Sequence, residues 1–176
     1  GYGGSCFPKD TLALLKTSQD YDAPQRIVEA VVSVNDNRKR AMGRKVIAAM
    51  GGDVRGKTVA VLGLTFKPNT DDMRDSPAIA VIQTLQDAGA TVRAYDPEGM
   101  EQARKVLDNV SYCKGSYEAM EGADALAIVT EWDAFRALDL PRVKSLLSEP
   151  IFVDLRNIYP RAMIEEAGFQ YHAVGR

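Results

Sequence analysis

Cysteine and histidine are scarce in this chain, which has two cysteines and one histidine among its 176 residues. Cys6 and Cys113 are far apart in the sequence and fit no zinc-ligand spacing, and His172 alone could not supply a histidine-based metal site. We therefore expect no metal centre. So few cysteines are also typical of a protein that works in a reducing cytoplasm, and we expect this location.

Long apolar runs are also absent. No stretch approaches the roughly 20 apolar residues of a membrane-spanning helix, and the first residues do not have the pattern of a signal peptide. The net charge is −2, and Lys and Arg are spread along the chain. This distribution argues against binding to nucleic acid or to an anionic membrane. A hydrophobic content of 45% and a charged content of 26% are typical of a globular protein.

The first fifty residues have the pattern of two helices. We expect a short helix that begins near residues 8–11 and fades near residues 18–20. A second helix begins near Pro24, because proline favours the first turn, and ends before Gly51. Its apolar residues mostly recur three, four or seven positions apart. A helix of this length spans about 40 Å, so we expect it to bridge two bodies or to pack against a partner chain.

From Lys57 onwards, short apolar segments alternate with helical ones, and Ser76 and Pro77 are typical of a helix start. This alternation predicts βαβ units and therefore an α/β fold with a doubly wound, mostly parallel, Rossmann-like sheet. The predicted strands are 58–62, 91–95, 110–112, 125–129, 151–155 and 169–172. The predicted helices are 76–89, 98–107, 116–120, 133–137, 140–147 and 160–167.

The first candidate site is the cysteine in Gly1-Tyr2-Gly3-Gly4-Ser5-Cys6-Phe7-Pro8-Lys9-Asp10. Glycines let a ligand approach the backbone closely, and Cys6 offers a soft nucleophile. The adjacent helix start and Lys9 both favour a thiolate. Three structural alternatives remain open: Cys6 is a small buried turn residue, Asp10 only caps the helix, and Lys9 is a solvated charge. A hydrolase dyad of Cys6 with His172 lacks an accompanying orienting motif.

The second candidate site is the loop of residues 63–76, which follows the first strand of the sheet. Ligands of such sheets bind at the carboxyl ends of the strands. The loop has one glycine, so it is not a dinucleotide fingerprint. Phe66 could stack on a ring, and Lys67 and Arg74 could contact phosphates. The alternative interpretation is a polar surface loop.

Two further residues follow predicted strands at the same edge of the sheet. Arg156 comes after the strand 151–155 and is a candidate for ligand contact. Asp96 ends the strand 91–95, where such folds often place a ribose-binding carboxylate. Because Pro97 follows it, we favour a turn-forming role for Asp96.

Residues 1–10 and 61–77 together closely resemble the UDP-glucose 6-dehydrogenases of the UDP-glucose/GDP-mannose dehydrogenase family, and residues 95–97 and 153–157 fit the same family. The likeness covers essentially the whole chain but only the C-terminal half of such an enzyme. It implies that the N-terminal NAD-binding domain is missing here, together with a catalytic lysine, a threonine and a glutamate. The resemblance therefore implies that this chain is inactive alone.

The resemblance implies a four-electron oxidation of UDP-glucose to UDP-glucuronate that uses two NAD. In such a reaction Cys6 attacks the intermediate aldehyde, the thiohemiacetal gives hydride to the second NAD, and water hydrolyses the resulting thioester. Asp10 matches the aspartate that assists the water and the proton transfers. Lys9 and Arg74 match NAD contacts. The implied substrate contacts are Gly1, Tyr2, Gly3, Phe66, Lys67 and Arg156.

The resemblance also implies three parts of the chain. Residues 1–22 form the catalytic-cysteine loop and a short helix, residues 23–52 form a central helix through which two copies dimerise, and residues 53–176 form the UDP-sugar-binding domain. Two alternatives remain: a related UDP- or GDP-sugar dehydrogenase, and a stand-alone nucleotide-binding and dimerisation module without catalysis.

Overall fold

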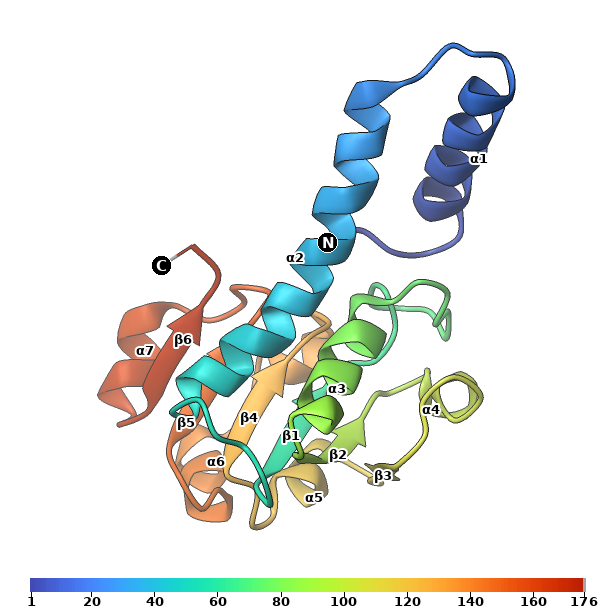
Figure 1. Ribbon diagram of the computed structural model, residues 1–176. Helices are drawn as coiled ribbons and strands as arrows, with labels where there is room; N and C mark the ends of the chain where they lie inside the picture. Colours follow the sequence, from blue (N-terminus) through green and yellow to red (C-terminus); the bar gives the residue numbers. More distant parts are fainter. Residues whose placement is uncertain (176) are drawn as a thin grey trace.

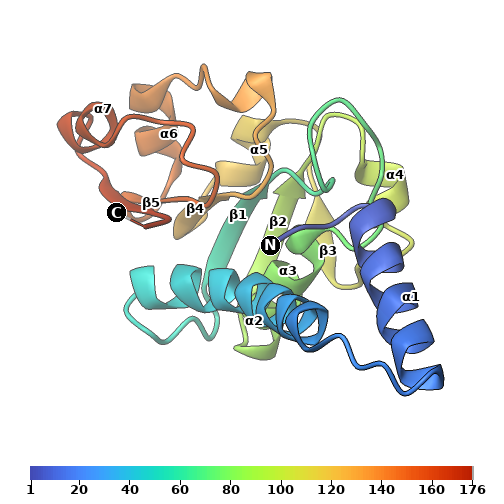
Figure 2. The ribbon, with the colours of Figure 1, turned by 90° about the horizontal axis from the view of Figure 1, so that it is seen from above.

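The computed structural model describes residues 1–175 and consists of a helical hairpin attached to an α/β sheet (Figure 1). The hairpin is formed by α1 (Cys6–Asp20) and α2 (Arg26–Ala49). The carboxyl-terminal part of α2 packs on the sheet domain, whereas its amino-terminal part extends beyond the domain alongside α1 (Figures 1 and 2). The expected long helix is therefore present, and it connects α1 to the sheet domain.

The sheet has six strands in the order β3-β2-β1-β4-β5-β6, and every neighbouring pair is parallel. The predicted doubly wound parallel sheet is confirmed. The strand order changes direction between β1 and β4, which is where ligands of such folds bind. The strands are β1 (Thr58–Leu62), β2 (Thr91–Tyr95), β3 (Val110–Tyr112), β4 (Ala125–Ile128), β5 (Ile151–Asp154) and β6 (Gln170–Ala173).

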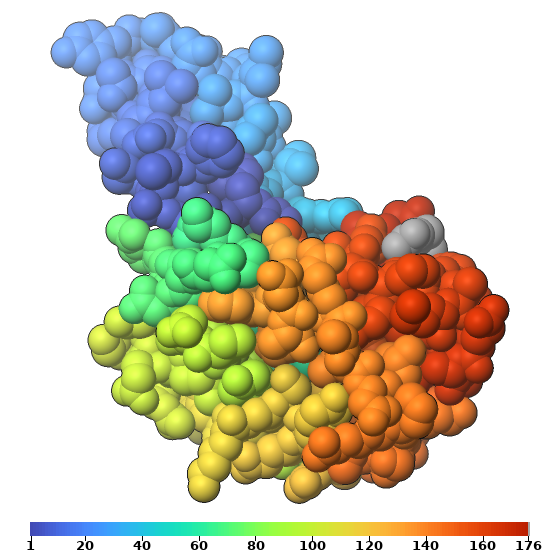
Figure 3. Space-filling model, turned by 180° about the vertical axis from the view of Figure 1, so that it is seen from behind, coloured from blue at the N-terminus to red at the C-terminus, as the bar shows by residue number. Residues whose placement is uncertain are grey.

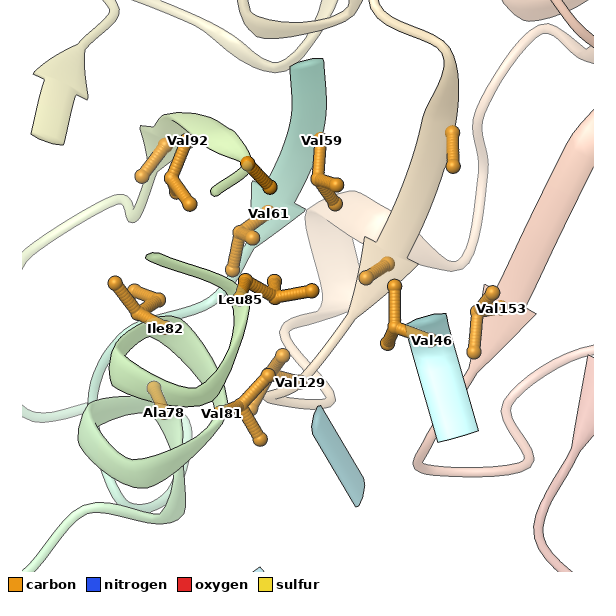
Figure 4. Packing of buried hydrophobic residues seen from close by; sticks show 14 of the residues in the cluster. Val46, Val59, Val61, Ala78, Val81, Ile82, Leu85, Val92, Val129 and Val153 are labelled. Carbon is orange, nitrogen blue, oxygen red and sulfur yellow. The ribbon is translucent and has the colours of Figure 1, made fainter. Parts of the chain in front are cut away.

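Two apolar clusters cover the two faces of the sheet. Val59 and Val61 point to the face that α2 and α3 (Pro77–Asp87) cover, as Figure 4 shows. Ala60 and Leu62 point to the opposite face, because side chains alternate along a strand. The helices of that face are α5 (Ser116–Met120), α6 (Leu140–Leu146) and α7 (Arg161–Glu166). Burial on both faces explains why β1 is almost entirely apolar.

The predicted helix boundaries hold where capping residues define them. Ser76 is the N-cap of α3, accepting a hydrogen bond from the amide of Ala78 at 3.2 Å, and Pro77 follows it. After α2, Gly51 has a φ of +87°, which suits the end of a helix.

Three predicted helices differ from the structure. α1 begins at Cys6, two residues before the predicted start at Pro8, because proline is tolerated throughout the first turn of a helix. The predicted helix over 98–107 is confined to α4 (Met100–Ala103), and the chain continues in tight turns to Leu107. A 3₁₀ turn, η1 (Asp133–Phe135), replaces the predicted helix 133–137. Within residues 1–175, no helix has the length and apolarity needed to cross a membrane.

α2 and α3 cross closely at Gly43, which is buried. A Cβ atom at Gly43 would lie 2.6 Å from Cβ of Thr84 on α3. This distance is well inside van der Waals contact, so the crossing depends on the missing side chain.

We expect Gly43→Val to lower the free energy of unfolding by about 1–3 kcal/mol, because the helices must separate to admit the side chain. Gly115→Val is the matched control, since no atom lies within 4 Å of a Cβ there and the backbone φ is −167°. Urea denaturation followed by circular dichroism measures both variants. Equal midpoints for the two variants would contradict the predicted close crossing.

Candidate active site

Two loops that are distant in sequence meet beyond the carboxyl edge of the sheet. Residues 1–5 lead into α1, and residues 63–76 connect β1 to α3. The amide of Gly4 donates a hydrogen bond to the carbonyl oxygen of Arg74 at 2.8 Å. In Figure 3 the N-terminal segment lies directly on the loop that follows β1. The two loops enclose an open pocket of about 420 Å³, lined by Gly3, Gly4, Ser5, Cys6, Phe7, Phe66, Lys67, Thr70 and Asp72.

The glycines of the first loop allow this contact. A Cβ atom on Gly3 would overlap the carbonyl oxygen of Asp75, and one on Gly4 would lie 2.7 Å from the ring of Phe66. Gly4 also has a φ of +82°, which other residues rarely adopt. In this structure the glycines bring the two loops together, whereas the sequence suggested close approach of a ligand.

Cys6 is the first residue of α1, and its side chain is exposed. The interpretation of Cys6 as a buried turn residue is therefore wrong. Its Sγ lies 3.7 Å from Oγ of Ser5, and the first-turn amides of α1 give this end of the helix a partial positive charge. The other cysteine, Cys113, is buried as expected of a structural residue.

Arg74 adds a full positive charge near Cys6. Its Nε and Nη2 atoms donate hydrogen bonds of 2.7–3.1 Å to the carboxylate of Asp72. These bonds raise the pKa of Arg74, with a smaller electrostatic contribution from the nearby Cys6, and they lower the pKa of the Asp72 carboxyl. Asp72 therefore fixes a cation close to the sulfur.

Phe66 and Lys67 come from the loop after β1 and line the same pocket as Cys6. The Nζ atom of Lys67 lies 5.3 Å from the centroid of the Phe66 ring, within range of a cation–π contact. The amide of Phe66 donates to the carbonyl oxygen of Asp72 at 3.1 Å, which holds the loop closed. An aromatic ring beside a cation suits a ligand with a ring and phosphates.

Asp96 anchors this loop and is fully buried at the end of β2. Its Oδ2 accepts hydrogen bonds from the amides of Leu64 and Thr65 and from Nε1 of Trp132, at 2.7–3.1 Å. Its Oδ1 accepts from the amides of Glu98 and Gly99, so the favoured turn-forming role is confirmed. Because both carboxylate oxygens of Asp96 already accept hydrogen bonds, they have little capacity left to bind the hydroxyls of a ribose. The anchoring of the loop was missed from sequence, because an aspartate before proline is explained by the turn alone.

Arg156 lies outside the Cys6 pocket. Its Nε and Nη2 contact the carboxylate of Glu131 at 2.6 and 2.8 Å. With Gly1, Arg156 lines a second, smaller pocket of about 220 Å³ near the ends of β4 and β5. The structure thus divides the predicted substrate contacts among three places, because Tyr2 lines neither of these pockets but a third one, with Gly1 and residues of α2.

Lys9 and Asp10 are exposed and pair with each other at 3.3 Å. Neither residue lines the Cys6 pocket, and Asp10 lies within α1, so the interpretation of Asp10 as a helix cap is wrong.

His172 lies on β6, which Figures 1 and 2 place far from α1. Burial lowers the pKa of His172, and no hydrogen bond joins it to Cys6 within residues 1–175. A Cys6–His172 dyad is therefore not formed.

The fold is a Rossmann-like parallel sheet, and its pocket has an exposed cysteine beyond the carboxyl edge. The UDP-binding-domain profile of the UDP-glucose/GDP-mannose dehydrogenase family matches residues 60–161, and the profile of the family's central domain matches residues 1–37. The chain therefore belongs to the UDP-glucose/GDP-mannose dehydrogenase family.

Its relatives include the UDP-glucose 6-dehydrogenase of Rhizobium meliloti, which is 66% identical over the whole chain, and TuaD of Bacillus subtilis, a UDP-glucose 6-dehydrogenase that is 42% identical. The chain spans about two fifths of their lengths, 40% and 38%. A UDP-glucose dehydrogenase from Pyrobaculum islandicum superposes with a TM-score of 0.79 at 35% identity, covering 98% of this chain and 37% of its own. An NDP-N-acetyl-D-galactosaminuronic acid dehydrogenase from Methanosarcina mazei has a TM-score of 0.87 at 26% identity, covering 100% of this chain and 38% of its own.

We expect Asp96→Ala to lower the free energy of unfolding by about 3 kcal/mol or more, because several buried donors lose their acceptor at once. The emission of Trp132, the single tryptophan, should change as its Nε1 loses its partner. Urea denaturation followed by tryptophan fluorescence measures both effects. Asp53→Ala is the control, because exposed ion pairs such as Asp53–Arg55 contribute little. A midpoint for Asp96→Ala equal to that of the control would contradict the anchoring role.

Proposed function

We propose that this chain forms the central-helix and UDP-binding part of a UDP-glucose 6-dehydrogenase, which oxidises UDP-glucose to UDP-glucuronate with two NAD. The observation that carries the proposal is the pocket that joins Cys6 to Phe66 and Lys67. The 66% identity with the Rhizobium meliloti enzyme supports this substrate over other sugar nucleotides. Because the chain covers 40% of that enzyme, the complete reaction requires further residues, and we propose that the chain alone is inactive.

We propose that the pocket of Cys6 holds the sugar and part of the nucleotide. Phe66 stacks on the uracil ring, and Lys67 binds a phosphate, because a compact ammonium group suits phosphate oxygens. The backbone of Gly1, Tyr2 and Gly3 lies along the sugar nucleotide. Arg156 contacts the substrate from the neighbouring pocket near β5, so a substrate that reaches both must span the two pockets.

We propose that Cys6 is the nucleophile for the second oxidation. Its Sγ forms a bond to the C6 aldehyde of the sugar, and the carbonyl oxygen takes up a proton to give a thiohemiacetal. Loss of a hydride and a proton leaves a thioester. Water then attacks the thioester, the C–S bond breaks, and a carboxylate and the free thiol are released. The covalent bond keeps the aldehyde in the site between the two oxidations.

Asp10 lies four residues after Cys6 on α1, so the two side chains emerge on the same face of the helix. Its carboxylate is exposed, and within residues 1–175 its one ion pair is with Lys9. We propose that Asp10 orients the attacking water and accepts its proton.

Bound NAD would supply the hydride acceptor for each oxidation. Lys9 and Arg74 suit contacts with its phosphates, because both are cations with side chains 74% and 70% exposed on the side of Cys6. These two side chains could not enclose a dinucleotide, and the loop after β1 has no glycine-rich fingerprint. We therefore propose that an N-terminal NAD-binding domain supplies most of the cofactor site.

We divide the chain into the cysteine loop with α1 (1–22), the central helix (23–52) and the UDP-sugar-binding domain (53–176). Ile27, Val31 and Val34 are exposed along α2, and this apolar face supports dimerisation through the central helix. The scarcity of cysteine supports a cytoplasmic location for the protein.

A chimera tests the nucleophile. In it, this chain replaces the corresponding segment of the Rhizobium meliloti enzyme, and NADH formation from UDP-glucose is followed. We expect the isolated chain to form no NADH and the chimera to be active. Cys6→Ser should lower the rate of the chimera on the order of 10³-fold or more, because the weaker hydroxyl nucleophile replaces the thiol.

Cys113→Ser is the matched control and should retain the rate of the chimera, since Cys113 is buried away from the pocket. Sustained turnover by the isolated chain, or a Cys6→Ser chimera as fast as this control, would refute the proposed role.

Calorimetry with UDP and UDP-glucose tests the substrate site independently of turnover. Lys67→Ala should weaken UDP binding by roughly 10–100-fold, as expected when a charge-assisted hydrogen bond to phosphate is lost. Lys16→Ala removes another exposed lysine, near the other end of α1, and should leave the affinity unchanged. Equal affinities for the two variants would exclude Lys67 from the phosphate site.

A further inference from the structure

Asn35 is a polar residue of α2 whose side chain is directed at the loop before Cys6. It is only 7% exposed. Its Oδ1 accepts a hydrogen bond from the amide of Tyr2 at 2.7 Å, and its Nδ2 donates to the carbonyl oxygen of Tyr2 at 3.1 Å. The side-chain amide thus satisfies both backbone polar groups of one residue, as a neighbouring strand would. A Cβ atom on Gly1 would lie 2.6 Å from this Oδ1.

Lys39 lies one turn after Asn35 on the same face of α2 and is also buried, with 7% of the residue exposed. Its Nζ lies 3.7 Å from a carboxylate oxygen of Asp75, at the end of the loop that follows β1. Asp75 has a φ of +50°, so its backbone is held in an uncommon conformation. One face of α2 therefore contacts both of the loops that form the Cys6 pocket.

The two loops also contact each other directly beside these anchors. Gly3 packs on the carbonyl oxygen of Asp75, and Gly4 donates to the carbonyl oxygen of Arg74. The segment before Cys6 is thus fixed at Tyr2 by α2 and at Gly4 by the second loop. Cys6 begins α1 only two residues further on, so the direction of the sulfur depends on both attachments.

We propose that Asn35 is a positioning residue for the reaction at Cys6. It aligns the Cys6 loop with the loop after β1, so that the nucleophile meets the sugar of a nucleotide whose uracil and phosphate are bound by Phe66 and Lys67. Lys39 supports the same alignment from the side of Asp75. The expected effect on the reaction rate rests on the proposed function. The expected effect on the alignment of the two loops does not depend on any activity.

Hydrogen exchange of the chain tests the structural consequence. The Gly4 amide bonds to Arg74 and not to Asn35, so its exchange reports whether the alignment depends on Asn35. We expect Asn35→Leu to speed exchange of the Gly4 amide by about tenfold or more, as expected from the loss of two buried hydrogen bonds nearby. The amides of β1 should exchange at the rate of the unmodified protein. Asn35→Asp keeps an acceptor for the Tyr2 amide and loses the donor, so its effect should be smaller and in the same direction.

Asn37→Leu is the matched control, because Asn37 is an exposed asparagine of the same helix whose side chain makes no hydrogen bond within residues 1–175. In the chimera, Asn35→Leu and Asn35→Asp should lower kcat by about 10–100-fold, because small displacements of a nucleophile are costly. The KM for UDP-glucose should stay within the range of the control. A residue that only stabilised the fold would instead lower the fraction of active protein, with parallel loss of the β1 amide protection.

Exchange of the Gly4 amide at the control rate in both Asn35 variants would overturn the proposal. The proposal is also overturned if Gly4 and β1 amides accelerate together in both variants, because Asn35 then stabilises the whole fold. If the unmodified chimera forms no NADH, the proposed function fails while hydrogen exchange still decides the alignment. A kcat equal to that of the control in an active chimera would refute the catalytic consequence.

Discussion

The buried carboxylate of Asp96 is the interaction on which the candidate site depends. It lies at the end of β2 and gathers donors from the loop after β1, from its own turn and from Trp132. These partners lie in three separate loops, which follow β1, β2 and β4. A buried carboxylate of this kind is stable only when its hydrogen bonds are complete. The loop that carries Phe66 and Lys67 is therefore held in place from its first residues.

A second constraint acts from the other side of the pocket. Gly3 and Gly4 let the Cys6 loop lie against the loop after β1, and Asn35 holds the same segment from α2. The pocket is thus built between the helical hairpin and the sheet domain. The pocket is therefore lined by residues of both bodies and by neither alone.

Most of the fold could be predicted from sequence because its signals are local. β1, β2 and β3 have the predicted bounds, since apolar strands between turns are easily recognised. The helix predicted over 98–107 is longer than α4, because helical spacing alone does not show where tight turns replace a helix. Cys6, Phe66 and Lys67 could be selected from motifs and resemblance. Asn35 and the anchoring by Asp96 could not, because most of their partners are backbone groups, which leave no pattern in the sequence.

The strand order also sets when the site can form during folding. β1 is central to the sheet, yet its second neighbour, β4, begins more than sixty residues later in the chain, and the amide of Thr58 bonds to Asp124. Trp132, which completes the partners of Asp96, follows β4. Contacts of such long sequence separation form slowly. On a ribosome, the Cys6 loop must therefore wait for most of the chain to be synthesised before its binding surface is complete.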